Sequence, residues 1–134
     1  MTQTGHVRTI STDRAPAPAG HYAQATIAGD QLYIAGQLPI WADGTPLPDL
    51  RFETQARQAI GNMLAVLDAA GATPAQLARV TAYIVGVEQW RRFDAVFAEM
   101  LGNARPARTV VPVSELHHGF LVEIDAIALV ARPA

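Results

Sequence analysis

The segment 121–131, LVEIDAIALVA, limits most strongly what this chain can fold into. Its composition is typical of a β-strand, in which successive side chains point to opposite sides of the sheet. One side would carry Val122, Ile124, Ala126, Ala128 and Val130, and the other Leu121, Glu123, Asp125, Ile127 and Leu129. Because neither set resembles a solvated surface, we expect both faces of the sheet to be covered.

The chain supplies enough helix to cover only one of these faces. Apolar residues over 51–70 recur at spacings of three and four, which predicts one amphipathic helix. A second stripe, closed by Gly102, predicts another helix and consists of Trp90, Phe93, Phe97 and Met100. Since two helices cover one face, we expect the other face to pack against further copies of the chain.

The remaining strands define the fold class. We expect them at 6–11, on both sides of a Gly29-Asp30 turn, at 79–86 and at 107–114. The short connection 115–119 favours an antiparallel pairing of the last two strands. The element order predicts an α+β fold with six strands in a single sheet and two helices on one face. With 134 residues, we expect a single domain over 1–134, in which 1–5 are loose.

The composition removes several kinds of chemistry. The chain has no Cys, and all ten basic residues are Arg, so it offers neither a Schiff-base lysine nor a thiolate. The histidines have no metal-binding spacing, and His117 and His118 are expected to be solvated in a loop, so we expect no metal and no cofactor. A net charge of −2 disfavours nucleic acid as a partner. The absence of a signal-like or membrane-spanning apolar run predicts a cytoplasmic protein without a membrane partner.

Two charged residues are the main candidates for chemistry. Arg108 opens a Val-rich strand, where a buried guanidinium needs a partner: either a ligand carboxylate or an internal acid, Glu123 or Asp125. Glu123 lies on a mostly apolar strand face beside Asp125, where its pKa could be raised so that it positions or deprotonates a water. Alternatively, these acids neutralise Arg108 and an arginine of a partner subunit.

The chain resembles a known family in five consecutive segments. They read HYAQATIAGDQLYIAGQLP, ETQARQAIGNMLAVLDAAGA, RVTAYIVGVEQW, RPARTVV and LVEIDAIA. Together they are similar to the Rid family of reactive-intermediate imine deaminases, also called YjgF or endoribonuclease L-PSP, over residues 21–131. The resemblance implies an α+β fold of the bacillary chorismate-mutase type, assembled as a homotrimer with ligand clefts between the subunits.

The resemblance also implies roles for individual residues. Arg108 would clamp the carboxylate of the substrate, and Glu123 would orient the attacking water. Tyr22 and Gly36 would line the cleft, and Val110 would offer its main chain to the ligand. The reaction implied is the hydrolysis of small 2-imino or enamino acids, which are reactive intermediates, to 2-keto acids and ammonia without a cofactor.

Several positions depart from the family pattern. They are His21 in place of Pro, Ala35 in place of Ser, Asp94 in place of Asn, Val110 in place of Cys, and His117-His118 in place of Pro-Lys. Ala35 and Asp94 remain expected substrate-binding positions, although Ala35 removes a hydroxyl and Asp94 adds a charge. These changes motivate an alternative, a non-catalytic module that binds small carboxylates or acts as an interaction protein. Endoribonuclease activity is disfavoured by the acidic balance and the lack of Lys.

Overall fold

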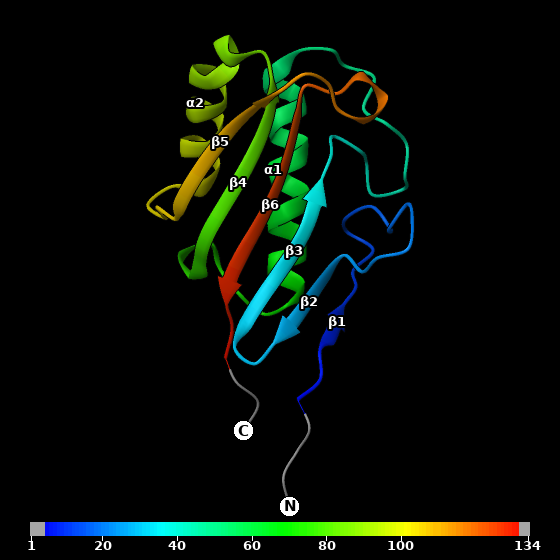
Figure 1. Cartoon of the computed structure of the whole chain (residues 1–134), viewed down its shortest axis with the longest axis vertical. Coiled ribbons are helices and arrows are strands. Elements are labelled where there is room, and N and C mark those ends of the chain that lie inside the picture. The colour runs from blue at the N-terminus through cyan, green and yellow to red at the C-terminus, as the bar shows by residue number, and fades with distance from the viewer. Residues whose placement is uncertain (1–4, 132–134) are drawn as a thin grey trace, which may run out of the picture.

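The computed structural model describes residues 5–131, which form one mixed sheet with two long helices on one side (Figure 1). The segment 1–5 that the sequence predicts to be loose lies, apart from Gly5, outside the described residues. The strands are β1 (Arg8–Ile10), β2 (Ala25–Ala28), β3 (Gln31–Gln37), β4 (Leu77–Val85), β5 (Ala107–Val113) and β6 (Val122–Leu129). The helices are α1 (Phe52–Ala69) and α2 (Trp90–Leu101), with short 3-10 turns η1 (Pro74–Gln76), η2 (Val87–Gln89) and η3 (His117–Gly119).

The sheet order is β1-β2-β3-β6-β4-β5, so the last strand of the chain lies in the middle. All neighbouring strands are antiparallel except β4 and β5, which are parallel. The prediction that β5 and β6 pair as antiparallel neighbours is therefore wrong. Helix α2 carries the chain back across the sheet, which places β5 parallel to β4 at the edge. The strand β6 then lies between β3 and β4, with a paired strand along each of its edges.

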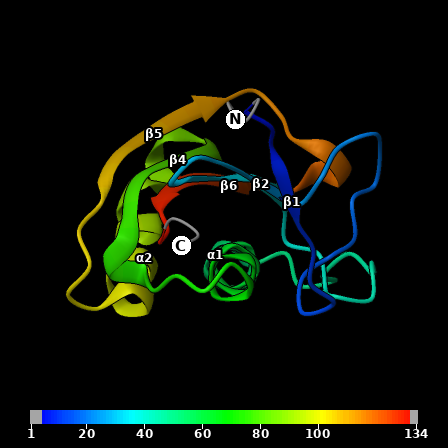
Figure 2. The same cartoon turned by 90° about the horizontal axis from the view of Figure 1, so that it is seen from below.

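Both long helices pack on the same side of the curved sheet (Figure 2). The predicted stripe of α1 is buried there, with Ala56, Ile60 and Met63 all 0% exposed. From β6, Val122 and Ile124 point into the same core and are also fully buried. The expected helical layer on one face is therefore confirmed. No helix within residues 5–131 is long and apolar enough to cross a membrane.

The other side of the sheet, here called the open face, has no helix over it (Figure 2). Strand alternation and register place on it Tyr33, Thr81, Tyr83, Val85, Val111, Leu121, Glu123, Asp125, Ile127 and Leu129. Tyr33 is 40% and Leu129 50% exposed, and the other residues named for this face are half-buried. An apolar sheet surface of this kind leaves the single chain with uncovered hydrophobic area.

Candidate functional site

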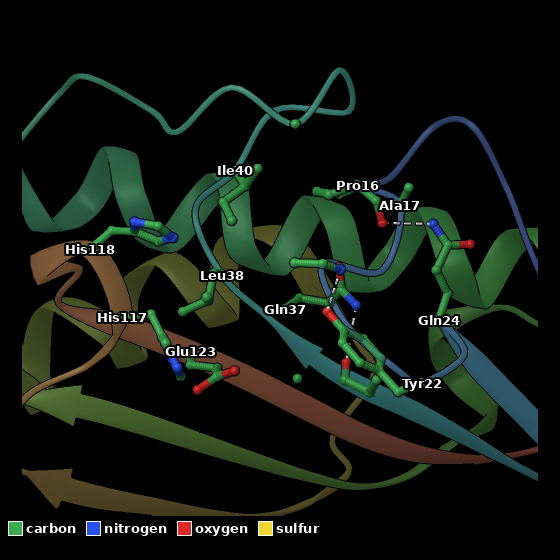
Figure 3. A pocket seen from close by; sticks show the side chains of 14 residues that line it. Pro16, Ala17, Tyr22, Gln24, Gln37, Leu38, Ile40, His117, His118 and Glu123 are labelled. Carbon is green, nitrogen blue, oxygen red and sulfur yellow. Dashed lines mark hydrogen bonds between the residues drawn. The ribbon is translucent and has the colours of Figure 1, made fainter.

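A cavity of about 540 Å³ lies where β3 and β6 meet the loops before β2 and before β6 (Figure 3). We call it the Glu123 cavity. It is lined by Pro16, Ala17, Ala19, Tyr22, Gln24, Ala35, Gly36, Gln37, Leu38, Ile40, Gly44, His117, His118 and Glu123. Three of the residues expected from the sequence to line a cleft, Tyr22, Ala35 and Gly36, thus lie around one cavity with Glu123.

Glu123 lies on the open face of β6 and is half-buried. Burial raises the pKa of its carboxyl group, the nearby His117 lowers this pKa, and Asp125 raises it. In Figure 3 the His117 ring lies beside the Glu123 carboxylate. A carboxyl group whose pKa is raised in a cavity is suited to exchanging a proton with a bound water.

Asp125, the second acid on this face of β6, has a different environment. The hydroxyl group of Tyr83 donates a hydrogen bond to Asp125 Oδ2 at 3.1 Å. Burial raises the pKa of Asp125, and the Tyr83 hydrogen bond lowers it. Because Asp125 is hydrogen-bonded to the neighbouring strand and does not line the cavity, Glu123 is the carboxylate that faces the cavity.

Gly36 lets the backbone of β3 approach Glu123. The pairing of β3 with β6 shifts register between Ile34 and Gln37, and Gln37 pairs with Ile124. A Cβ atom on Gly36 would lie 2.5 Å from Glu123 Oε2 and 3.1 Å from its carboxyl carbon. The site therefore needs a residue without a side chain at this irregularity of the sheet.

The loop that carries Tyr22 is held by one buried glutamine. The side-chain amide of Gln24 donates hydrogen bonds to the carbonyl oxygens of Thr12, Ala15 and Pro16, at 2.8–3.2 Å. Its Oε1 accepts a hydrogen bond from the backbone N–H of Thr12 at 2.7 Å. Gln24 is 3% exposed, whereas Tyr22 is 53% exposed. Gln24 therefore holds the loop from its buried side, and the Tyr22 side chain remains exposed where it lines the cavity.

The opposite wall is held by a buried asparagine of α1. Asn62 Nδ2 donates hydrogen bonds to the carbonyl oxygens of Leu38 and Ile40, at 3.1 and 2.8 Å. Both of these residues line the Glu123 cavity. Their side chains give this wall an apolar surface, which would exclude water from one side of a bound molecule.

His117 and His118 line the cavity, although the sequence predicts ordinary solvated loop histidines. They belong to η3, in which His118 adopts a left-handed conformation with φ of +60°. Both are exposed, but they face the cavity that holds Glu123. Only their position just ahead of the strand bearing Glu123 could have indicated this role from the sequence.

Arg108 lies on the other side of the sheet. It pairs with Val80 in the parallel β4–β5 register, so its side chain shares the face covered by α2. Its Nη1 donates a hydrogen bond to Asp94 Oδ1 at 2.9 Å, and the side chain is 18% exposed. The guanidinium carbon lies 5.1–5.7 Å from three ring centroids, those of Trp90, Phe93 and Phe97. These distances are typical of cation–π contacts.

The internal partner of Arg108 is therefore Asp94 and not Glu123 or Asp125. The alternative with those two acids is wrong because β6 is separated from β5 by β4, and both carboxylates point to the open face. Arg108 and Asp94 line a second cavity of about 320 Å³, the Arg108 cavity, together with Phe97, Ala98, Gly102, Ala104, Arg105 and Pro106.

The expected site residues thus form two groups in the single chain. Tyr22, Ala35, Gly36 and Glu123 surround one cavity, and Arg108 and Asp94 line the other. Val110 is half-buried two residues beyond Arg108 and lines neither of these cavities. Within residues 5–131, no cluster of three or more His, Asp or Glu side chains is arranged to hold a metal ion.

The fold and the two cavities define a small α+β protein with one sheet face free of helices. Comparison with known proteins supplies the family: residues 12–130 match the family model described as endoribonuclease L-PSP. The chain belongs to this family, which includes the YjgF, RutC and Rid proteins.

Known relatives match this chain over most of their own length. A RutC family protein of Pyrococcus horikoshii is 40% identical over 119 residues, which are 89% of this chain and 94% of the relative. A 2-iminobutanoate/2-iminopropanoate deaminase of Dermatophagoides farinae is 32% identical over 92% of this chain and 96% of its own. The crystal structure of RidA from an Antarctic Psychrobacter matches with a TM-score of 0.86 and 33% identity, covering 92% of this chain and 99% of that one.

Proposed function

We propose that this protein hydrolyses small 2-imino or enamino acids to 2-keto acids and ammonia. The observation that carries the proposal is the half-buried Glu123 carboxyl, with its raised pKa, in a cavity walled by Tyr22 and Gly36. Arg108, whose planar guanidinium suits a carboxylate, supplies the group that would hold the substrate. The deaminase of Dermatophagoides farinae, 32% identical to this chain, supports the same assignment.

Hydrolysis of an imine requires only a few groups of the protein. An imine carbon is electrophilic, so Glu123 needs only to take a proton from a water as the new C–O bond forms. The C=N electrons move to the nitrogen, which takes the proton back from the Glu123 carboxyl group. The hydroxyl proton of the adduct then passes to the nitrogen as the C–N bond breaks, which forms the C=O group and releases ammonia. Arg108 would hold the carboxylate throughout, and Ala35 and the main chain of Val110 would complete the contacts. Such positioning and proton transfer need neither a nucleophilic side chain nor a cofactor.

We further propose that the site is completed between the copies of a homotrimer. Arg108 and Glu123 lie on opposite faces of the sheet, so one small ligand needs each of them from a different subunit. The open face offers the apolar surface for this assembly, with Leu129 and Tyr33 exposed on it. The protein would act in the cytoplasm on intermediates released by pyridoxal-phosphate enzymes.

A second candidate function is that of a non-catalytic module that binds small carboxylates or acts as an interaction protein. It is supported by the ion pair between Arg108 and Asp94, which already gives the guanidinium a carboxylate partner. Ala35 also lacks the hydroxyl that the family pattern places in the cleft. RNA cleavage has less support, because the net charge is −2 and the chain contains no Lys for contacts to a phosphate backbone.

The test is to generate 2-aminoacrylate in situ and follow the formation of pyruvate. We expect the protein to accelerate pyruvate release over the uncatalysed rate, and Arg108→Ala to abolish the acceleration. No acceleration by the wild-type protein, or full activity of Arg108→Ala, would refute the proposal. Binding of 2-ketobutyrate without any turnover would instead support the non-catalytic function.

A further inference from the structure

The carboxylate of Asp94 is bound to the guanidinium of Arg108, the group that the proposed function assigns to the carboxylate of the substrate. The two groups meet at 2.9 Å through Arg108 Nη1 and Asp94 Oδ1. Arg108 is mostly buried among aromatic rings, whereas the Asp94 side chain is 47% exposed toward the same cavity. The contact uses Nη1, and a guanidinium carries five N–H donors, so further donors can reach a ligand.

A ligand carboxylate bound to Arg108 would therefore lie close to a second carboxylate. Three charged side chains line the Arg108 cavity: Asp94, Arg105 and Arg108. Arg105 is exposed at the rim, where solvent screens its charge. Asp94 lies directly against the guanidinium, so its negative charge acts on any group held there.

We propose that Asp94 makes this site discriminate between ligands by their net charge, favouring zwitterionic 2-iminium acids over anionic 2-keto acids. The inference rests on the proposed function and names the form of substrate taken and the product released. A protonated imine carries its positive charge on the nitrogen bonded to the carbon next to the carboxylate, so this charge would lie close to Asp94 when the carboxylate is bound by Arg108. Hydrolysis removes this cation and leaves only the carboxylate, which Asp94 repels.

The consequence is an aid to product release. A site with Arg108 alone would hold substrate and product by the same carboxylate contact, and product would compete with substrate. Two unit charges some 6 Å apart in a partly solvated site change affinity by about three- to tenfold. Asp94 would weaken binding of the product by this factor while leaving the zwitterion little affected.

The two roles that Asp94 can have differ in a measurable way. If Asp94 only neutralises Arg108 and holds it in place, its loss changes the affinity of every carboxylate by the same factor. If it discriminates by charge, its loss changes the affinity of an anion and not that of a zwitterion. The ratio of the two affinities therefore separates the roles, even if the variant is less stable than the wild type.

The experiment measures binding of 2-ketobutyrate and 2-aminobutyrate, which share a carbon skeleton, by calorimetry on the assembled protein. Asp94→Asn keeps an oxygen that can accept the Arg108 hydrogen bond but removes the charge. Asp94→Ser serves as a second neutral variant in case the first folds poorly. Glu99→Gln is the control, because Glu99 lies on the same helix and pairs with Arg57 at 2.8 Å, outside the Arg108 cavity.

We expect Asp94→Asn to tighten 2-ketobutyrate binding by about three- to tenfold. The affinity for 2-aminobutyrate should change less than about twofold, and Glu99→Gln should leave both unchanged. Equal changes for the two ligands, or no change, would overturn the inference, as would a wild-type protein that binds neither. Because no turnover is measured, a protein that shows this discrimination yet hydrolyses no imine would refute the proposed reaction alone.

Discussion

Gly36 lies so close to Glu123 that a Cβ atom at position 36 would be 2.5 Å from the carboxylate oxygen Oε2. The contact joins the irregular part of β3 to the central strand β6 and defines one wall of the Glu123 cavity. The position of the carboxylate is therefore set by the backbone of the neighbouring strand, and small changes there should act on the proposed chemistry before they act on the fold.

Gly36→Ala should lower turnover of 2-aminoacrylate by roughly ten- to a hundredfold, because the added methyl group displaces the carboxylate that the proposed mechanism uses to take a proton from water. The carboxyl end of Glu123 is flexible, so the variant should still fold. The matched control is Gly61→Ala in α1, where the added Cβ meets only Met100 Cε at 4.0 Å. The control should keep full turnover and gain about 0.5–1 kcal/mol in stability. Full activity of Gly36→Ala would show that the close approach has no catalytic importance.

Glu123→Gln should stabilise the protein at pH 8, although it should lower turnover by about 10²-fold or more. Burial raises the pKa of Glu123 above its ordinary value of 4.5, so the folded state favours the protonated carboxyl. Above the raised pKa the ionised group costs stability, and this cost disappears as the pH falls below 4.5. Urea unfolding at fixed protein concentration checks the sign. A wild type more stable than the variant at pH 8 would contradict it.

His117→Gln should move the acid limb of the pH–rate profile to higher pH. The positive charge of His117 lowers the pKa of Glu123, so its removal raises that pKa further, and the base form is lost at a higher pH. His118→Gln is the control, since His118 lines the same cavity without being a cause of the shift. The measurement is kcat between pH 4 and 9 for the three proteins. An unmoved limb in His117→Gln would exclude this coupling.

Leu129→Asp should break the assembly. Leu129 is 50% exposed at the end of β6 on the open face, where a charge would have to be buried against another copy. Ala95→Asp, exposed on α2 on the opposite side of the sheet, should leave the assembly intact. Sedimentation should give a monomer for Leu129→Asp and a trimer for the wild type and the control. A trimeric Leu129→Asp would mean that subunits meet elsewhere.

The sequence predicts the elements of this fold better than their order in space. Periodicity alone predicts α1 and α2, and the alternation over 121–131 predicts a strand with two apolar sides. The predicted antiparallel pairing of β5 with β6 is wrong because the length of the loop 115–119 does not indicate that β4 lies between these two strands. A parallel crossover through α2 decides the order, and its packing against β4 and β5 is a tertiary property.

The candidate site likewise has a part that the sequence predicts and a part that depends on the tertiary structure. Tyr22, Ala35 and Gly36 lie around the same cavity as Glu123, because β3 pairs with β6 and the loop before β2 also lines the cavity. The position of Arg108 could not be predicted, because its direction depends on the register with β4. Its partner Asp94 lies 14 residues earlier, on α2, and no spacing rule links a helix to the strand that follows it.

The central claim, that one site takes Arg108 from one copy and Glu123 from another, can be tested by mixing two inactive variants. Arg108→Ala and Glu123→Gln are unfolded together in equal amounts, refolded, and shown by native mass spectrometry to form mixed trimers. Random assortment then gives about a quarter of the clefts both intact residues, so the mixture should regain about a quarter of wild-type pyruvate formation. A mixed trimer no more active than either variant alone would contradict the account.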